Sequence, residues 1–353
     1  MASSLGKHVE QLRGSRILLT GAAGFLGFNF LHFFSYLNSL PQGRTKAGAV
    51  RVVAADNFLR GQPRWIMELA KSDKHLDLRR CDIVWPWNAR DTKFDYIIHG
   101  ASIASPTFYR QYPLETLDAN VTGLRNMLDL AMRAKAKSML FFSSSEIYGD
   151  PVPTEIPTSE SYRGNVGCVG PRACYDESKR LGETLCYIYA EKHKLPVKMV
   201  RPFNNYGPGL RLTDKRVLPD FFTDVLAGRD LRVLSDGTPT RTFCYASDAV
   251  TGYLLALLSN GSGEAYNIGA DNLEISMRDL ANLVAKVSGG TLGVTCEVSK
   301  DRAYLTDNPQ RRCPDLTKAR TRLGYNPLVS LEDGLSRLHH WYRNFLPLEA
   351  NVK

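Results

Sequence analysis

The feature that most constrains this sequence is a glycine-rich turn between a strand-like and a helix-like segment. Residues 16–20 form a short apolar run of strand length, and residues 28–34 are apolar at near-helical spacing. A turn of this kind lets the backbone approach a pyrophosphate closely and presents the free N–H groups of a helix N-terminus to it. The pattern therefore predicts a phosphate-binding turn made by Gly21, Gly24, Phe25, Leu26 and Gly27.

A second strand-like segment, residues 50–55, ends in Asp56 and Asn57. An acidic side chain at the tip of the second strand hydrogen-bonds the ribose hydroxyls of NAD and repels the 2′-phosphate of NADP. Asp56 follows Gly27 by 29 residues, whereas about 20 are usual. The polar segment 38–48 accounts for the difference as a surface loop. We expect Asp56 and Asn57 to contact NAD.

Strand-like and helical segments continue to alternate. Residues 76–82, 94–99 and 138–143 have the pattern of strands, and residues 113–134 that of a helix. Such alternation predicts an α/β fold, a Rossmann-type doubly wound parallel sheet with helices on both faces. Ligands of these sheets bind at the carboxyl ends of the strands, so we expect further NAD contacts from Asp82, Ile83, Ala101, Ser102, Asn120 and Pro202.

The simple alternation ends near residue 204, and this break predicts two domains. We expect residues 1–203 to form the NAD-binding domain, with residues 235–265 returning to it. A smaller, mostly C-terminal α/β lobe that binds the substrate is expected from residues 204–234 and 266–353. Its amphipathic patterns predict helices at residues 217–227, 274–288, 314–323 and 331–345.

Charge and cysteine usage exclude several classes of protein. The chain has 45 Lys and Arg against 36 Asp and Glu, a net charge of +9. The positive residues form no basic block, which argues against a nucleic-acid partner, but they are densest between Arg201 and Arg241, where they suit an anionic small molecule. Seven cysteines without a C-x-x-C pair indicate neither a metal site nor a disulfide framework. Together with the lack of an 18-residue apolar run or an apolar leader, they predict a cytoplasmic protein with no membrane contact.

Residues with catalytic chemistry follow the strand at 138–143. Ser144, Ser145 and Glu146 stand at its end, and Tyr175 and Lys179 follow with the i, i+4 spacing of one helix face. A lysine ammonium near a phenol lowers the pKa of that phenol. Tyr175 can then take a proton from an alcohol while NAD removes the hydride, and the Ser144 hydroxyl can hold the same alcohol oxygen.

This combination of residues resembles the extended short-chain dehydrogenase/reductases of the epimerase/dehydratase type, which act on nucleotide sugars. The resemblance covers nearly the whole chain, and residues 144–151 and 164–177 look most like the UDP-glucuronate decarboxylases, or UDP-xylose synthases. It implies NAD as cofactor, a nucleotide-diphosphate sugar such as a UDP-sugar as substrate, no metal, and a homodimer built on a four-helix interface. It assigns catalytic roles to Ser144, Ser145, Glu146, Tyr175, Lys179 and Arg241, and substrate binding to Ser105, Glu146, Arg172, Asn204, Arg216, Arg241, Tyr245 and Arg312.

The expected reaction also has a chemical logic of its own. Oxidation of a hexuronic acid at C4 places its carboxylate β to a ketone, so that carbon dioxide leaves as electrons flow into an enolate, without a metal or a second cofactor. C5 is then reprotonated, and retained NADH returns the hydride to C4. The 4,6-dehydratases carry Asp-Glu where this chain has Ser145-Glu146, and C4-epimerases usually lack the carboxylate of Glu146. The alternatives are a UDP-glucuronate or UDP-hexose 4-epimerase, which the epimerase-like residues 218–220 favour, a related 4,6-dehydratase, a decarboxylase that releases the 4-keto pentose, or a non-enzymatic NAD-sensing protein.

Overall fold

A seven-stranded parallel sheet forms the centre of the molecule. The computed structural model describes residues 1, 5–44, 48–88, 90–298 and 309–346. All strand pairs of the main sheet are parallel, in the order β3 (Leu76–Arg80), β2 (Arg51–Asp56), β1 (Arg16–Thr20), β4 (Tyr96–His99), β5 (Ser138–Phe142), β6 (Val197–Pro202) and β11 (Glu264–Ile268). The order reverses beside β1, as in a doubly wound sheet. The expected Rossmann-type α/β class is confirmed.

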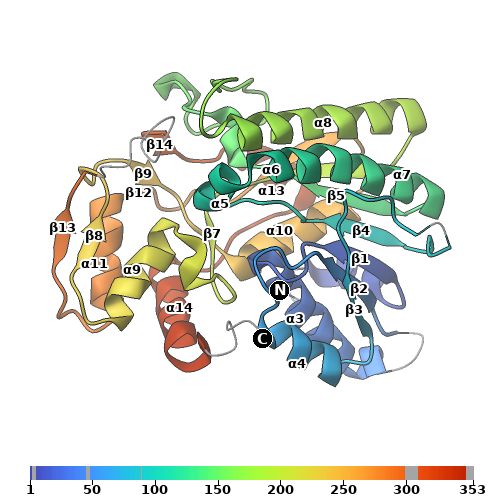
Figure 1. Ribbon diagram of the computed structural model, residues 1–353, viewed down its shortest axis with the longest axis horizontal. Helices are drawn as coiled ribbons and strands as arrows, with labels where there is room; N and C mark the ends of the chain where they lie inside the picture. The colour runs from blue at the N-terminus through green and yellow to red at the C-terminus, as the bar shows by residue number, and fades with distance from the viewer. Residues whose placement is uncertain (2–4, 45–47, 89, 299–308, 347–353) are drawn as a thin grey trace.

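Helices cover both faces of this sheet (Figure 1). One face carries α3 (Phe25–Ser39), α4 (Arg64–Ser72) and α10 (Ala246–Leu258), and the other carries α7 (Leu124–Ala134) and α8 (Ala173–His193). Helix α3 is largely apolar because it packs both on the sheet and on the neighbouring α10, and four of its phenylalanines are buried: Phe28, Phe30, Phe33 and Phe34.

The helix expected over residues 113–134 is interrupted. It consists of α6 (Pro113–Asp118), a π-helical turn at Ala119–Gly123, and α7. Asn120 lies in the π turn, and its side-chain amide donates to the Ser178 hydroxyl on α8 at 2.9 Å. Helix α5 (Pro106–Gln111) precedes α6. The short helices are η1 (Gly6–His8), α2 (Val9–Leu12), η2 (Pro41–Arg44), η4 (Ser145–Tyr148), η5 (Pro153–Glu155) and η6 (Leu212–Asp214).

A smaller lobe stands beside the carboxyl edge of the sheet, on the left of Figure 1. Its separate apolar core is built from α9 (Val217–Leu226), β8 (Leu231–Val233), α11 (Met277–Val287), β13 (Val294–Cys296) and α14 (Leu331–Phe345). Three short strands, β12 (Ile275–Ser276), β9 (Thr240–Arg241) and β14 (Arg311–Arg312), form one small sheet, and β7 (Asn205–Tyr206) pairs with β10 (Cys244–Tyr245).

The expected boundary at residue 265 cuts through a strand of the main sheet. Tyr266, Asn267 and Ile268 pair in parallel register with β6, because Tyr266 and Ile268 complete the core beneath α10. Helix α13 (Thr317–Leu323) also packs on β11 and α10, not on the lobe. The large unit therefore includes two segments that we assigned to the lobe. Of the expected lobe, residues 299–308 and 347–353 lie outside the described residues.

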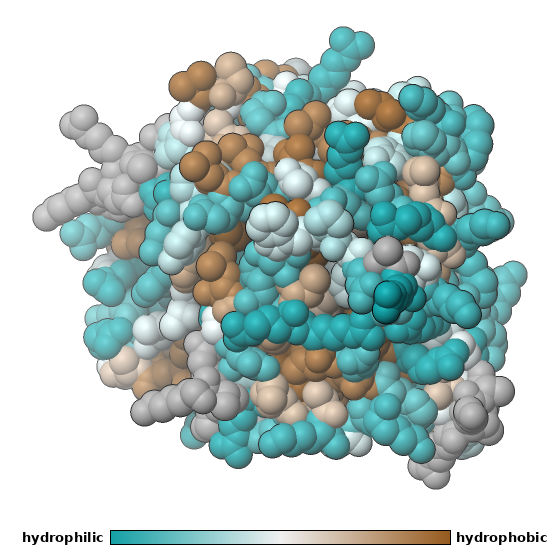
Figure 2. Space-filling view, turned by 45° about the vertical axis from the view of Figure 1, so that its right-hand side comes forward, coloured by the Kyte–Doolittle hydropathy of each residue, from teal (hydrophilic) through white to brown (hydrophobic). Residues whose placement is uncertain are grey.

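The surface alternates polar and apolar residues. Figure 2 shows hydrophobic residues in small groups between hydrophilic ones on one face of the molecule. Among the residues that the structure describes, no helix combines the length and the apolar character needed to cross a membrane. The seven cysteines, all within the described ranges, are unpaired thiols.

The packing of Gly27 gives a test of the fold. A Cβ at this position would lie 2.3 Å from the carbonyl oxygen of Ala22 and 2.7 Å from that of Gly21, backbone atoms that cannot move aside. We expect Gly27→Ala to lower the free energy of unfolding by about 3 kcal/mol in urea denaturation, the upper range for overpacking. Gly324→Ala is the control, since Gly324 has open space and a φ of +67°. Its left-handed backbone should cost about 1 kcal/mol. Equal losses for the two variants would contradict the tight contact between turn and helix.

Candidate functional site

The glycine turn presents an uncapped helix N-terminus. Helix α3 begins at Phe25, and the preceding Gly24 is extended and supplies no side-chain cap. Gly21 has a φ of +73°, and a Cβ there would lie 2.7 Å from the backbone nitrogen of Ala101. The turn therefore lies directly on the chain that follows β4. Free N–H groups and the positive end of the helix dipole fit the pyrophosphate of a dinucleotide.

Asp56 stabilises this turn. Its carboxylate accepts hydrogen bonds from the backbone N–H groups of Ala23 at 2.9 Å and Phe58 at 2.8 Å. Burial raises the pKa of Asp56, and these two hydrogen bonds offset only part of the increase. Beside it, the Asn57 amide donates to the Asp82 carboxylate at 3.1 Å, so the ends of β2 and β3 are joined.

The other expected cofactor residues gather along the same edge of the sheet. Ala101 and Ser102 follow β4, Ile83 follows β3 and is buried beneath the π turn, and Pro202 ends β6. The Ser102 hydroxyl is buried and has no hydrogen-bond partner among the described residues. This arrangement fits a dinucleotide that lies across the carboxyl ends of the strands, and each single contact to NAD stays a prediction.

The three residues expected to perform proton transfer lie together. Ser144 follows β5, and its hydroxyl is hydrogen-bonded to that of Tyr175 in the first turn of α8. The Lys179 ammonium nitrogen lies 5.6 Å from the centre of the Tyr175 ring and donates to the carbonyl oxygen of Phe142 at 2.7 Å. The Tyr175 ring also stacks on that of Tyr109, with 5.1 Å between ring centres.

The direction of the Tyr175 pKa shift differs from our expectation. We expected Lys179 to lower it, but burial raises the pKa of Tyr175, and the Ser144 hydrogen bond offsets only part of this. Burial also lowers the pKa of Lys179 to about 7. The physical reason is that both groups lie in a desolvated site that disfavours charge on either of them. In the protein without cofactor, the pair therefore resists forming a phenolate next to an ammonium.

Glu146 lies between two arginines. Its carboxylate accepts hydrogen bonds from Arg312 at 2.5 and 2.8 Å and forms an ion pair with Arg172. Arg172 also faces Asp176 at 3.8 Å, one turn further along α8. Burial would raise the pKa of Glu146, but the charges of Arg172 and Arg312 outweigh burial and hold it well below its usual value. The resemblance assigns a catalytic role to Glu146, and this arrangement keeps it an ionised carboxylate, which cannot donate a proton.

A cavity between the two parts of the molecule is lined by six of the eight expected substrate residues: Glu146, Arg172, Asn204, Arg216, Arg241 and Arg312. Its lining holds seven cationic side chains against the acidic Glu146 and Asp220. Clefts with such a surplus of positive charge attract anions. The cavity is therefore suited to a phosphorylated or carboxylated ligand.

Two of the expected substrate residues lie outside this lining. The Ser105 hydroxyl instead donates to the carbonyl oxygen of Asp214 at 2.7 Å. Tyr245 packs edge-to-face on Tyr206 and lies beside the Arg337 guanidinium, because its side chain completes the core of the lobe. Direct substrate contact by Tyr245 is thus not supported by its position.

Arg241 lines the cavity but is not the arginine that meets Glu146. Its guanidinium donates to the carbonyl oxygens of Thr240 at 2.7 Å and Pro309 at 2.5 Å. Arg312 lies beside it in the parallel pairing of β9 and β14 and reaches Glu146 instead. Arg241 therefore holds the strand that presents Arg312.

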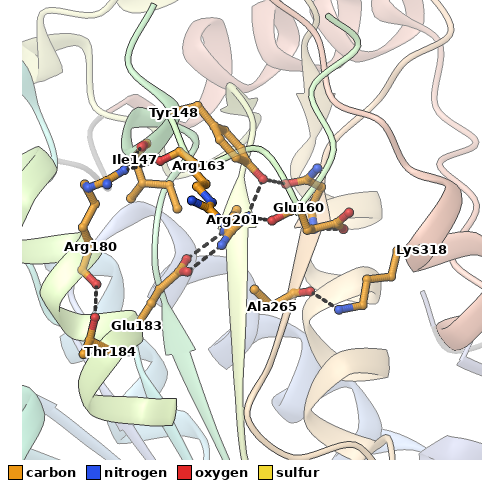
Figure 3. A network of polar contacts seen from close by, with 11 residues as sticks. Ile147, Tyr148, Glu160, Arg163, Arg180, Glu183, Thr184, Arg201, Ala265 and Lys318 are labelled. Atoms are coloured by element: carbon orange, nitrogen blue, oxygen red, sulfur yellow. Dashed lines mark hydrogen bonds and ion pairs between the residues drawn. The ribbon is translucent and has the colours of Figure 1, made fainter. Parts of the chain in front are cut away.

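A buried network behind the cavity fixes the segment that carries Glu146 (Figure 3). Arg201, at the end of β6, makes two hydrogen bonds to Glu183 on α8, at 2.8 and 2.6 Å, and one to the Tyr148 hydroxyl at 2.6 Å. Arg180 donates to the carbonyl oxygen of Ile147 at 2.9 Å. Helix α8 and β6 thus hold η4 from two sides.

The same network extends to the segment that follows Arg312. The Tyr148 hydroxyl donates to the Asn267 side chain at 2.8 Å, and the Asn267 amide donates to the carbonyl oxygens of Thr158 at 2.9 Å and Asp315 at 3.1 Å. Thr158 also accepts a hydrogen bond from the backbone of Asp315 at 2.9 Å. One connected set of hydrogen bonds therefore positions both the segment that carries Glu146 and the segment that follows Arg312.

Two residues of the site did not emerge from the sequence. Tyr109 lines the cavity and stacks on Tyr175, and its hydroxyl is buried without a hydrogen-bond partner among the described residues. Asp214 is buried between Arg60 and Arg216. Their signals were weak, because neither belongs to a motif: Tyr109 follows Ser105 by four residues, and Asp214 precedes Arg216 by two.

Comparisons with known proteins agree with this geometry. A model of the NAD dependent epimerase/dehydratase family matches residues 17–269. UDP-glucuronic acid decarboxylase 1 of Xenopus tropicalis is 38% identical over 352 residues, 98% of this chain and 76% of the relative. UDP-glucuronic acid decarboxylase 5 of Arabidopsis thaliana is 36% identical over 340 residues, 95% of this chain and 92% of the relative.

Solved structures give the same result. A dTDP-glucose 4,6-dehydratase of Streptomyces venezuelae, solved with NAD bound, has a TM-score of 0.77 at 26% identity, over 94% of this chain and 97% of that one. A UDP-glucuronic acid 4-epimerase of Bacillus cereus, in complex with UDP-glucuronic acid and NAD, has a TM-score of 0.76 at 26% identity, over 93% and 99% of the two chains.

The ion pairs of Glu146 give a pH-dependent test. We expect Glu146→Gln to lower the free energy of unfolding by about 3 kcal/mol at pH 7, because it removes the charge of the carboxylate that two buried arginines share. The pKa of Glu146 is lower in the folded than in the unfolded chain. The stabilisation is therefore fully present above the unfolded pKa of about 4.3 and is lost as the pH falls below it.

Urea denaturation of both proteins between pH 7 and pH 3 measures this difference. Glu155→Gln serves as the matched control, because Glu155 is exposed. Its effect should stay within about 0.5 kcal/mol at every pH. A difference between wild type and Glu146→Gln that stays constant down to pH 3 would contradict the depressed pKa.

Proposed function

The chain belongs to the NAD dependent epimerase/dehydratase family, and from that membership we propose that it decarboxylates UDP-glucuronate to UDP-xylose. The family resemblance that we expected is confirmed, and NAD is the cofactor of the family. Relatives 35–38% identical over nearly the whole chain are named UDP-glucuronic acid decarboxylases. What carries the proposal is the Arg172–Glu146–Arg312 cluster inside a cationic cavity.

The protonation state of Glu146 favours decarboxylation over dehydration. Loss of water from C6 needs an acid for the leaving hydroxyl. Glu146 is held ionised by two arginines, and the neighbouring Ser145 is a poor proton donor. Loss of carbon dioxide from a β-keto acid needs no acid at that step. It needs the bond between C5 and the carboxylate to be aligned with the C4 ketone, which receives the electrons as an enolate. Arg172 and Arg312 hold the carboxylate in place when the substrate shares them with Glu146.

Each group at the site has a part in this reaction. Bound NAD supplies the acceptor for the C4 hydride and the donor that returns it. Tyr175 takes the proton of the C4 hydroxyl and gives it back, and Ser144 holds the same oxygen. Lys179 lies beside the Tyr175 ring and, when protonated, supports negative charge on it during proton transfer. Arg216 and Lys215 line the cavity where the diphosphate is expected.

Epimerisation is the second candidate. Leu218, Pro219 and Asp220 line the cavity, and this short stretch looks more like that of C4-epimerases. A structural neighbour is a UDP-glucuronic acid 4-epimerase. Epimerisation requires only oxidation, turning of the 4-keto sugar and reduction from its other face, so the product distinguishes the two reactions.

Purified protein incubated with UDP-glucuronate and NAD tests the proposal. We expect carbon dioxide and UDP-xylose, identified by NMR, without net accumulation of NADH. A C4 epimer alone would refute decarboxylation, and NADH equal to carbon dioxide would mean that the 4-keto pentose is released. Tyr175→Phe should lower turnover by about 10²- to 10⁴-fold. Tyr36→Phe, which removes an exposed hydroxyl from α3, should change it little.

We also propose that the chain forms a homodimer through α6 and α8. These helices lie side by side and carry exposed apolar side chains: Leu114, Leu117, Leu181, Tyr187 and Ile188. Two copies of such a surface bury apolar area in a symmetric contact.

The free thiols fit a reducing compartment, and we therefore propose that the protein works in the cytoplasm.

A charged side chain on this surface tests the dimer. We expect Ile188→Asp to shift the protein from dimer to monomer in size-exclusion chromatography with light scattering, because the carboxylate would be desolvated in the interface. Leu273→Asp is the control, since Leu273 is equally exposed, at 45% against 44%, and lies elsewhere. A wild-type monomer, or a dimer unaffected by Ile188→Asp, would refute this interface.

A further inference from the structure

Arg60 connects the cofactor side of the site with the substrate side. It follows Asp56 by four residues, in the loop after β2. Its guanidinium lies over the ring of Phe108 on α5, 4.0 Å from the ring centre. One of its nitrogens lies 2.5 Å from a carboxylate oxygen of Asp214, which belongs to the loop between β7 and α9. One side chain thus joins three segments around the cavity.

Asp214 is shared between two arginines. Its side chain is only 4% exposed. One carboxylate oxygen accepts from Arg60, and the other forms an ion pair with Arg216. Burial would raise the pKa of Asp214, but the charges of Arg216 and Arg60 keep it below its usual value. The carboxylate is therefore ionised and in contact with both guanidinium groups.

The loop that carries Asp214 and Arg216 lies directly on the cofactor turn. Arg211 donates to the backbone carbonyl of Arg60 at 2.7 Å, and the Asn29 side chain of α3 donates to the carbonyl of Pro208 at 3.0 Å. A Cβ on Gly209 would lie 2.6 Å from the Phe28 ring. This close contact means that the position of Arg216 depends on the segments that form the cofactor edge.

The charges of this group determine what Arg216 can offer to a ligand. Arg216 lines the cavity, whereas Asp214 and Arg60 are absent from its lining. Asp214 alone would neutralise Arg216, because a buried carboxylate in contact competes with any phosphate for the guanidinium. With Arg60 on the other oxygen, the three side chains keep one net positive charge.

We propose that Arg60 is a positioning residue that balances the charge of Asp214 and so keeps Arg216 available to the diphosphate of the nucleotide sugar. The proposal rests on the proposed function for the class of substrate. It assigns to a residue of the cofactor loop an effect on nucleotide-sugar affinity, with no effect on the chemical step itself.

Calorimetric binding of UDP to the full chain tests the proposal directly. Arg60→Ala and Arg60→Gln should each raise the Kd for UDP about tenfold, the scale of one uncompensated charge near a phosphate. Arg60→Lys should retain most of the affinity, because it keeps the charge. With UDP-glucuronate, KM should rise to the same extent while kcat stays within about twofold.

Arg64→Ala is the matched control. It removes an arginine from the next helix, where the side chain forms an exposed i, i+4 ion pair with Glu68. We expect unchanged UDP affinity. Thermal unfolding and NAD binding of every variant show whether it is folded.

A double variant separates charge from structure. Arg60→Ala with Asp214→Asn restores one net positive charge, so UDP affinity should return toward that of wild type. If Arg60 acted only by holding the loop, the double variant would bind UDP more weakly than Arg60→Ala alone.

Three results would overturn the proposal: wild type that does not bind UDP, Arg60→Gln that binds as tightly as wild type, or a double variant weaker than the single one. If Asp214→Asn fails to fold, the Kd values of Arg60→Lys and Arg60→Gln for UDP still show whether the charge at residue 60 determines the affinity. If UDP binding follows the charges but UDP-glucuronate yields no carbon dioxide, the proposed reaction is wrong and the role of Arg60 remains.

Discussion

The geometry of the site depends on the ion pairs that the Glu146 carboxylate forms with Arg172 and Arg312. This carboxylate joins three segments that are far apart in the sequence, η4 after β5, the residue before α8, and β14. Removing charged groups from water is costly, and a buried ion pair often adds little to stability compared with apolar side chains of the same size. Its value here is geometric, because Arg172 and Arg312 are held at one place in the cavity.

A network of neutral and charged side chains holds the segments that carry Glu146 and Arg312 in place. Arg201 and Glu183 connect β6 with α8, and Tyr148 and Asn267 continue the connection to β11 and to the segment beside Arg312. Arg201 and Asn267 come from strands of the main sheet, and Glu183 comes from a helix that packs on it. A rigid sheet therefore fixes the relative positions of groups that lie on short, irregular segments.

What the sequence could predict was local or periodic. The glycine turn, the strand ends and the i, i+4 pair of Tyr175 and Lys179 are determined by neighbours along the chain, and the structure has them in the expected elements. The neighbours of Arg241 and Tyr245, and the sheet partner of β11, depend on contacts over long distances in the chain. No spacing pattern contains that information. The direction of the Tyr175 pKa shift likewise depends on burial, which the i, i+4 spacing does not report.

The cationic side chains that line the cavity contribute to the net charge of +9. They differ in how far neighbouring carboxylates neutralise them. Arg172 and Arg312 are matched by Glu146 and Asp176, and Arg241 donates to backbone carbonyls. Arg216 keeps its charge because Arg60 shares Asp214. A cationic group that is already oriented before the ligand arrives costs little reorganisation when a phosphate binds. The placement of carboxylates next to the arginines, more than the number of arginines, therefore determines where an anionic ligand is held.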